Sequence, residues 1–231
     1  MKPQPLALKV LNIASGLLFL GALAMVFLYA PLEITMNYVQ KIFYFHVANA
    51  WVGMLGFLAA AVAGVVYLIK HDQKWDIIEL TAVEISLVFF LIAIAAGSIW
   101  ARPTWGAYWT WEPRLTTAAI LEMVYISYIL LRQGIDDPDR RARFSAVYTL
   151  VGAISVPITF MSIRLFRTIH PVIIGSNSSA TMGSFDMTSK MLFTMFYTLF
   201  AFSVIFVDLF WHRIRLGQLA QQVEEYKLEE L

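Results

Sequence analysis

The feature that most constrains this chain is a series of six apolar stretches, each about as long as a bilayer is thick. A helix rises about 1.5 Å per residue, so about 20 apolar residues cross a hydrocarbon core of ~30 Å. The stretches lack the alternation of barrel strands, and a helix satisfies its own backbone in lipid. The sequence therefore predicts an all-α integral membrane protein, a six-transmembrane-helix bundle in a single domain spanning residues 1–231. The predicted spans are about 10–30, 47–69, 77–100, 115–131, 144–163 and 191–211.

Composition supports the membrane assignment and excludes several classes of protein. Hydrophobic residues make up 59% of the 231 residues and charged residues only 14%, against about 25% charged in soluble domains. A net charge of +1 gives no basic excess for binding nucleic acid. With no cysteine in the chain, disulfides, thiolate metal sites and thiol nucleophiles are excluded. Any chemistry must rest on histidine, carboxylates, arginine or tryptophan.

The positions of lysine and arginine predict the orientation. With the N-terminus inside, most of the seventeen basic residues fall in inner segments, as the positive-inside rule requires. Both termini are therefore predicted to be cytoplasmic. The first apolar run is too long for a cleaved signal peptide, and no small-residue cleavage site precedes Pro31, so we expect a retained helix.

This topology separates the four histidines into two pairs. His71 and His212 fall at inner helix ends beside basic residues, where we expect no ligand role. His46 and His170 fall on the outer side, at two different spans. Two imidazoles at one membrane face can approach a common metal from opposite sides, and the alternative is ordinary interfacial hydrogen bonding.

A tryptophan-rich segment lies between these two histidines in the sequence. It reads IWARPTWGAYWTWEPRLT over residues 99–116, and its outer loop is predicted at 101–114. An aromatic belt needs only one or two rings at each helix end. Clustered indoles instead form a flat apolar platform with N–H donors at the rim, suited to a large planar ligand. The segment contains Trp100, Trp105, Trp109 and Trp111.

Cationic residues flank this platform. Arg102 and Arg114 border it, and Lys41 precedes His46 by five residues. Such groups can bind carboxylates. Two outer imidazoles, an aromatic shelf and cations at its edge match a metal macrocycle with two propionates better than a bare metal ion, and bis-imidazole ligation of haem iron is a known mode.

These residues resemble a known family. The segment WGAYWTWEPRLT (105–116) is similar to the tryptophan-rich signature, usually WGxxWxWD, of the haem-handling cytochrome c assembly proteins. The segment FYFHVANAW (43–51) and the later His-Pro pair sit where that family has two outer-face histidines. The resemblance covers nearly the whole chain. Six spans match the short members of the family, whereas the related synthases are longer and have more histidines.

The resemblance implies a function. The chain would bind haem b transiently at the outer, periplasmic face of the bacterial cytoplasmic (inner) membrane. It would present this haem to a periplasmic haem chaperone during c-type cytochrome maturation, without being an enzyme itself. Its implied partners are the subunits of an ATP-binding-cassette transporter, a small single-span subunit and membrane lipid, with no nucleic acid.

The resemblance also assigns the site residue by residue. His46 and His170 would be the axial ligands of the haem iron, and Arg114 a propionate or loop-structuring partner. The chain departs from the family pattern in three places. Glu112 replaces aspartate and is followed by Pro113, and Lys41 stands at a position of arginine. Before His170 the chain reads Arg-Leu-Phe-Arg (164–167), where many members have a tryptophan pair. The full predicted set is His46, His170, Trp105, Gly106, Trp109, Trp111, Glu112, Arg114 and Lys41.

Two other functions compete with this one. A haem-dependent membrane redox protein would carry paired histidines inside its spans, which the predicted spans lack. A haem transporter would have broken helices and polar residues at the midplane, and a synthase subunit of the related type would be longer, with more spans and more histidines. The predicted midplanes are mostly apolar. Glu84 and Glu122 are ionisable groups within spans, which are costly unless they are paired or face a polar interior. Glu122 could belong to the site, but we favour helix packing or a subunit contact.

Overall fold

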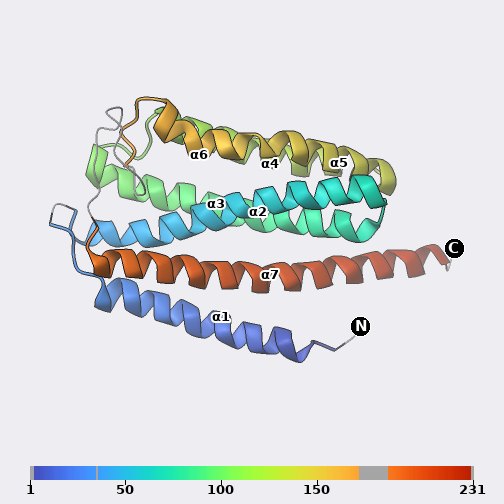
Figure 1. The fold of residues 1–231 in the computed structure, drawn as a ribbon. Helices are drawn as coiled ribbons and strands as arrows, with labels where there is room; N and C mark the ends of the chain where they lie inside the picture. The colour runs from blue at the N-terminus through green and yellow to red at the C-terminus, as the bar shows by residue number, and fades with distance from the viewer. Residues whose placement is uncertain (1–2, 35, 172–186, 230–231) are drawn as a thin grey trace.

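The computed structural model describes residues 3–34, 36–171 and 187–229, and this part of the chain is an all-helical bundle (Figure 1). Six helical units are long and apolar enough to cross a membrane, which confirms the predicted fold class. The helices are α1 (Leu6–Ala24, continued by a π-helix, Met25–Tyr29), α2 (Lys41–Lys70, after a 3-10 turn, Tyr38–Gln40), α3 (Gln73–Trp105), α4 (Pro113–Gln133), α5 (Pro138–Ala153), α6 (Ser155–Leu165) and α7 (Ser189–Glu229).

Local sequence signals fix where these helices begin and end. The side chain of Asp72 accepts a hydrogen bond from the Lys74 backbone N–H at 2.9 Å and starts α3. Asp137 caps α5 in the same way, followed by Pro138 at the first helical position. Proline is favoured there because its missing N–H has no helical partner to lose. At these two starts the preceding turn is short, with two residues between α2 and α3 and four between α4 and α5.

The fifth span consists of two helices, α5 and α6, which meet at Ile154. Pro157 follows three residues later and cannot donate the backbone hydrogen bond that an uninterrupted helix would make to Ala153. The span predicted at 144–163 therefore exists, with a break near its middle.

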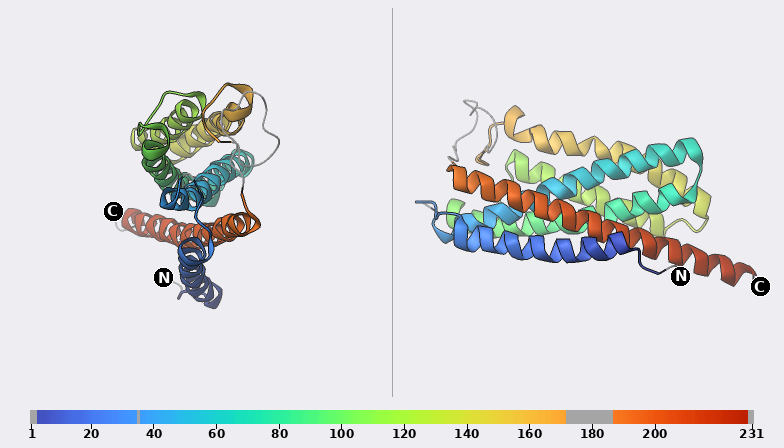
Figure 2. Two further views of the ribbon diagram at one scale, coloured as in Figure 1. Left: turned by 90° about the vertical axis from the view of Figure 1, so that its left-hand side faces the viewer. Right: turned by 60° about the horizontal axis from the view of Figure 1, so that its bottom comes forward.

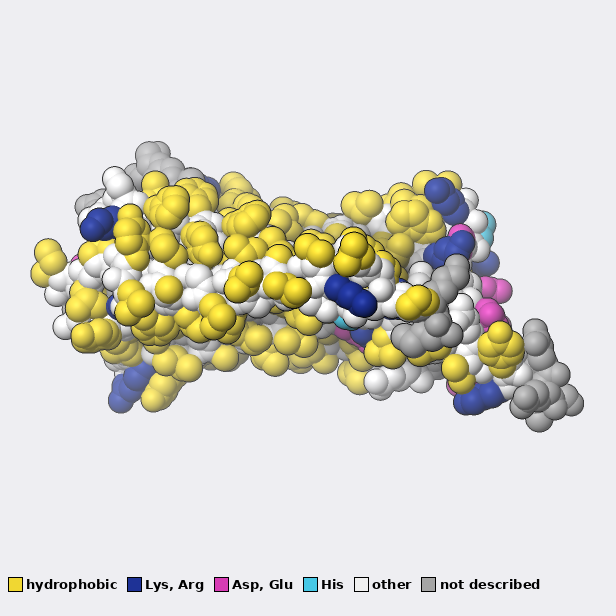
Figure 3. All heavy atoms as spheres, turned by 90° about the horizontal axis from the view of Figure 1, so that it is seen from below, with side chains coloured by type: hydrophobic (Ala, Val, Ile, Leu, Met, Phe, Trp, Pro, Cys, Tyr) yellow, Lys and Arg dark blue, Asp and Glu magenta, His cyan; other side chains and the backbone are white. Residues whose placement is uncertain are grey.

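The helices form layers. Helices α2 and α3 lie between a layer of α4, α5 and α6 on one side and α7 on the other, with α1 outermost against α7 (Figures 1 and 2). The largest buried cluster joins α2, α3 and α4, where Phe57 stacks on Tyr125 with ring centroids 3.8 Å apart. Apolar side chains cover most of the α1 face, and charged side chains concentrate toward its two ends (Figure 3). This distribution fits a protein surrounded by lipid.

The two ends of the bundle differ. Both termini lie at one end, together with the α2–α3 and α4–α5 turns (Figure 1). The opposite end carries the connections α1–α2 and α3–α4, the second of which includes the tryptophan-rich segment, together with the end of α6 and the start of α7. The predicted loop at 101–114 is corrected here, because α3 continues to Trp105 and residues 101–105 are helical. The helix ends only at Gly106, whose φ of 78° is accessible to glycine at little cost.

Candidate functional site

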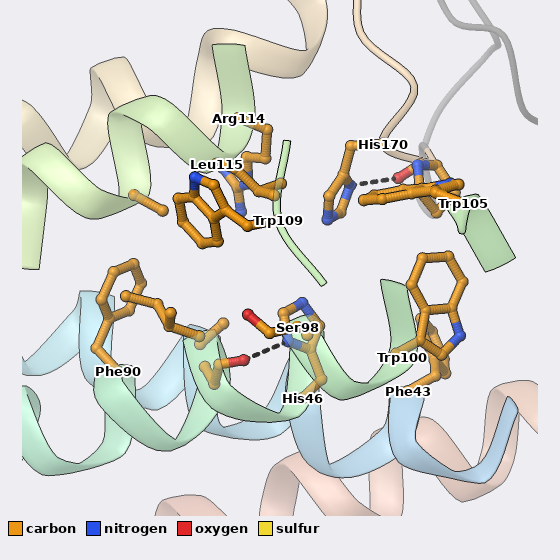
Figure 4. Close-up of a pocket in the computed structure, with 16 residues that line it drawn as sticks. Phe43, His46, Phe90, Ser98, Trp100, Trp105, Trp109, Arg114, Leu115 and His170 are labelled. Atoms are coloured by element: carbon orange, nitrogen blue, oxygen red, sulfur yellow. Dashed lines mark hydrogen bonds between the residues drawn. The ribbon is translucent and has the colours of Figure 1, made fainter. Parts of the chain in front are cut away.

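A cavity of about 80 Å³ opens at the end of the bundle that carries the tryptophan-rich segment. Its walls come from α2, α3, the start of α4 and the segment that follows α6 (Figure 4). Aromatic and aliphatic side chains dominate the lining, with two histidines and one arginine among them. The lining residues are Phe43, His46, Ala50, Phe90, Ala93, Ile94, Gly97, Ser98, Trp100, Trp105, Trp109, Arg114, Leu115, Ala118, His170 and Pro171.

His46 and His170 face one another across this cavity (Figure 4). Their ring centroids are 6.3 Å apart. His46 Nδ1 lies 2.8 Å from the Ala93 carbonyl oxygen, and His170 Nδ1 lies 3.1 Å from that of Pro171. A carbonyl oxygen only accepts, so each Nδ1 is the protonated nitrogen and each Nε2 keeps a free lone pair. A metal-ligating imidazole is commonly oriented in this way by a backbone carbonyl.

His170 stays neutral in this environment. Burial is the main cause that lowers the pKa of His170 from 6.5 to about 3, and electrostatic repulsion from Arg114 and coupling to the His46 ring lower it further. At neutral pH the ring is therefore an uncharged donor of a lone pair, the form that binds a metal ion.

The ring of His46 rests directly on the backbone of α3. A Cβ atom added at Gly97 would lie 2.8 Å from His46 Cε1 and 3.0 Å from its Nδ1. Such distances are too short for van der Waals contact, so only glycine admits the imidazole at this depth. The hydrogen bond to Ala93, one helical turn earlier, then fixes the direction of the ring.

His170 lies outside any helix and is connected to α4 through two side chains. The Thr168 hydroxyl donates to the Glu112 carboxylate, and the Thr168 oxygen accepts from the His170 backbone N–H at 3.0 Å. Glu112 also caps α4 by accepting from the Leu115 backbone N–H at 2.7 Å. The position of His170 therefore depends on the residue that caps the start of α4.

The tryptophans have different environments. Trp105 packs edge-to-face against His170 at 6.3 Å and against Trp100 at 5.2 Å. Trp109 lines the cavity, whereas Trp111 is 77% exposed and packs on the edge of Trp109. The indole N–H groups of Trp100 and Trp109 are buried without a hydrogen-bond partner in the described part of the chain. Buried donors of this kind are costly unless something accepts from them.

The chain matches the heme exporter protein C family over residues 4–229. It belongs to that family. The heme exporter protein C of Bradyrhizobium diazoefficiens is 33% identical over 199 residues, which cover 86% of this chain and 74% of that protein. Those of Rhodobacter capsulatus and Escherichia coli K12 are 32% and 30% identical over 141 and 142 residues, 58% of each relative. The chain is thus a multi-pass membrane protein that handles haem in cytochrome c biogenesis, and its family is one of transport components rather than enzymes.

The residues of this heme exporter protein C site fit haem. Imidazole nitrogens bind a metal ion at about 2.0–2.1 Å and lie about 1 Å from their ring centre, so two imidazoles that bind one ion from opposite sides have centroids about 6 Å apart. The observed 6.3 Å agrees with this value. The partnerless indole N–H groups supply donors for carboxylates, and Arg114 lines the same cavity. At about 80 Å³ the cavity is smaller than ligand pockets of about 300–1,000 Å³, so it would enclose a macrocycle only in part.

A third metal ligand is absent from this constellation. Within residues 3–34, 36–171 and 187–229, no group of three or more His, Cys, Asp or Glu side chains could hold a metal ion. His71 and His212 are remote from the cavity: His71 ends α2 with a φ of 53°, and His212 Nε2 lies 2.9 Å from Asn12 Oδ1. The separation of the four histidines into two pairs was predicted from topology.

The remaining predicted site residues are distributed unevenly. Arg114 lines the cavity and donates through its guanidinium to the Thr159 carbonyl. Lys41 is buried, and its Nζ donates to the Phe27 carbonyl at 3.0 Å instead of reaching the cavity. Gly106, Trp111 and Glu112 are also outside the lining. Contact of these four residues with haem stays a prediction.

Several lining residues were not predicted from the sequence. Trp100 had been placed in the tryptophan-rich segment but not in the site, and Gly97 and Ala93 lie within an apolar span. Ala93, Gly97 and Trp100 recur at spacings of four and three residues, which places them on one face of α3. The small residues on that face are the sequence signal that could have predicted where the His46 ring packs against α3.

Proposed function

We propose that this chain holds haem b between His46 and His170 and presents it at the outer face of the membrane to a periplasmic haem chaperone. The observation that carries the proposal is the histidine pair, with ring centroids 6.3 Å apart and each Nδ1 directed to a backbone carbonyl. Two neutral imidazoles with free Nε2 atoms are a ligand set for one iron.

The surrounding residues have separable tasks in this proposal. Bound haem would supply iron for ligation and a planar ring for delivery. Trp105 and Trp109 provide apolar walls that exclude water from the ring, while the indole N–H of Trp109 and the guanidinium of Arg114 are donors for propionates. No covalent bond is made or broken by the chain itself, consistent with holding and delivery.

The placement of the site supports delivery on the outer side. The cavity lies at the end of the bundle opposite both termini (Figure 1), and the sequence assigns the termini to the cytoplasm. A haem held there faces the periplasm of the bacterial inner membrane. On this proposal the ATP-binding-cassette subunits and the small single-span subunit assemble around the chain within the membrane.

The test is the absorption spectrum of the full-length protein purified in detergent from haem-replete cells. We expect a low-spin b-type spectrum at substoichiometric occupancy. His46→Ala and His170→Ala should each lose this spectrum and haem delivery, because each removes one of two ligands. His71→Ala and His212→Ala are matched controls from the opposite end of the bundle and should leave the spectrum unchanged.

Two outcomes would contradict the proposal. One is a colourless wild-type protein that does not take up added haem. The other is equal loss from all four histidine substitutions, which would indicate general damage instead of ligation. Added imidazole should partly restore the low-spin spectrum in the His46→Ala and His170→Ala proteins, since it supplies the missing nitrogen.

A further inference from the structure

The two histidines are held in unequal ways. His46 is part of helix α2, and its ring bonds to the backbone of helix α3. His170 lies in the non-helical residues 166–171 that follow α6, and its Nδ1 bonds to Pro171, its own neighbour in sequence. A bond between neighbours cannot attach that segment to the bundle. Whatever fixes His170 relative to His46 must therefore be another contact.

The His170 ring packs against Trp105 of α3, and Thr168 makes the hydrogen-bonded contact. The Thr168 side chain is 3% exposed, and its hydroxyl is both donor and acceptor: it donates to Glu112 and accepts from the His170 backbone N–H at 3.0 Å. One hydroxyl has one donor and can accept as well, so Thr168 supports both bonds at once. The histidine segment is thereby tied to a side chain that belongs to α4.

Glu112 is suited to this task because it uses its two oxygens for different partners. One oxygen, Oε1, accepts from the Leu115 backbone N–H at 2.7 Å and starts α4, while Oε2 accepts from Thr168. The bond from Leu115 N–H fixes the carboxylate at the start of α4, where the Thr168 hydroxyl donates to it. Arg114, two residues along, lines the cavity from the same helix start. The start of α4 thus sets both the wall of the cavity and the position of His170.

We propose that Glu112 and Thr168 are positioning residues that form a latch for His170 and set the rate at which haem leaves the site. The inference rests on the proposed function, in which His170 ligates the iron, and it gives the acidic residue of the tryptophan-rich motif a role without haem contact. With the latch closed, His170 Nε2 faces His46. Without it, the segment loses its link to α4 and His170 leaves the iron more often, while His46 keeps its seat on α3.

The test compares two substitutions at one atom in the full-length, haem-loaded protein. Thr168→Val removes the hydroxyl at nearly constant shape, whereas Thr168→Ser keeps it. We measure the low-spin fraction by absorption and the rate of haem loss to excess apo-globin. Orienting partners of metal ligands are commonly worth 10- to 100-fold, so Thr168→Val should release haem about tenfold faster or more, and Thr168→Ser should match wild type. Thr198→Val is the control, since it removes an equally buried hydroxyl in α7 that bonds the Thr194 carbonyl.

A double-mutant cycle identifies the residue through which the latch acts. The cycle is measured in His170→Ala and His46→Ala proteins whose low-spin spectrum has been restored by added imidazole. If Thr168 acts only through His170, Thr168→Val should add nothing in the His170→Ala background and should keep its full effect beside His46→Ala. Glu112→Gln gives an independent measurement, because an amide has one oxygen where the carboxylate uses two. It should accelerate haem loss in the same direction, and added imidazole should restore the low-spin spectrum of both single variants.

The outcomes separate this inference from the proposed function. A wild-type protein that binds no haem would overturn both. A wild type with the expected low-spin spectrum, combined with unchanged haem loss in Thr168→Val, would overturn the latch alone. Equal acceleration by Thr168→Ser and Thr168→Val would also overturn it, as would an additive effect of Thr168→Val in the His170→Ala background.

Discussion

Replacing Gly97 with alanine should displace His46 without unfolding the protein. The added Cβ would lie 2.8 Å from His46 Cε1, whereas ordinary contact begins at 3.4 Å, so the ring must retreat by about 0.6 Å. The hydrogen bond from His46 Nδ1 to Ala93 would lengthen from 2.8 Å to about 3.4 Å, beyond the usual limit of about 3.2 Å. The ring would lose both its depth and the bond that orients it.

The free energies of folding and of haem binding should respond differently to this change. Glycine inside a helix is about 1 kcal/mol less favourable than alanine, and a lost hydrogen bond costs about 0.5–1.5 kcal/mol. These terms nearly cancel, so we expect a change in unfolding free energy within about 1 kcal/mol. Loss of an orienting partner costs a metal site about 10- to 100-fold in affinity, which corresponds to about 1.4–2.7 kcal/mol.

The assay is a haem titration followed by absorption, with thermal unfolding of the same preparation. Gly64→Ala is the matched control, because its Cβ would be equally crowded, 2.8 Å from Thr149 Oγ1, but at the α2–α5 contact and outside the cavity lining. Gly97→Ala should lose affinity and low-spin character while Gly64→Ala keeps both. Unchanged affinity in Gly97→Ala, or equal losses in the two variants, would refute the reasoning.

Three further predictions concern the site and the opposite end of the bundle. The pKa of His170 in the folded protein is about 3, below its ordinary value of 6.5, so neutral His170 favours the folded site fully above pH 6.5 and progressively less toward pH 3. The low-spin spectrum should therefore persist from pH 8 to about 5. A midpoint near pH 6.5 in an absorption titration would contradict this prediction. Trp109→Ala should lower haem affinity about five- to hundredfold, which is equivalent to about 1–3 kcal/mol of stacking. Trp111→Ala should change the affinity less than about twofold, because the Trp111 ring is 77% exposed and lies outside the cavity. Haem occupancy per membrane-inserted protein measures both effects. Arg132→Leu should cost about 3–5 kcal/mol of stability, because it leaves the buried Asp76, its partner at 2.5 Å, without a counter-charge. Adding Asp76→Asn should partly recover the stability measured by thermal unfolding. No recovery would contradict the ion-pair explanation.

The spans could be predicted because lipid imposes one simple requirement. A run of about 20 apolar residues satisfies it whatever the details of packing, so all six spans were identifiable. Helix ends were less predictable because α2 and α3 continue past the apolar runs, to Lys41 and to Trp105. Glu112 followed by Pro113 is a signal for a helix start that the sequence did contain. Reading that pair as a cap would have predicted the end of the outer loop.

The histidine pair could be predicted from topology, but the contacts that hold each ring in place could not. His46 and His170 each lie beside a span at the same end of the bundle, so their proximity follows from the order of the spans. Gly97 lies inside an apolar run, and hydropathy does not say which face of that run meets another helix. The contact between Thr168 and Glu112 joins segments 56 residues apart. It depends on where α6 ends, and the break at Ile154 helps to determine that.

The tryptophan-rich segment shows why a motif is a poor guide to direct contact. Trp105 and Trp109 line the cavity, Gly106 ends α3, Glu112 begins α4, and Trp111 is mostly exposed. A short segment that must end one helix, turn and start another cannot direct every side chain to one ligand. Holding and releasing haem requires that His170 be fixed at one time and released at another. The residues that end α3 and cap α4 are therefore as necessary as the tryptophan rings that line the cavity. Substitutions at the caps should therefore change the rate of haem release, while substitutions at the wall should change how much haem is bound.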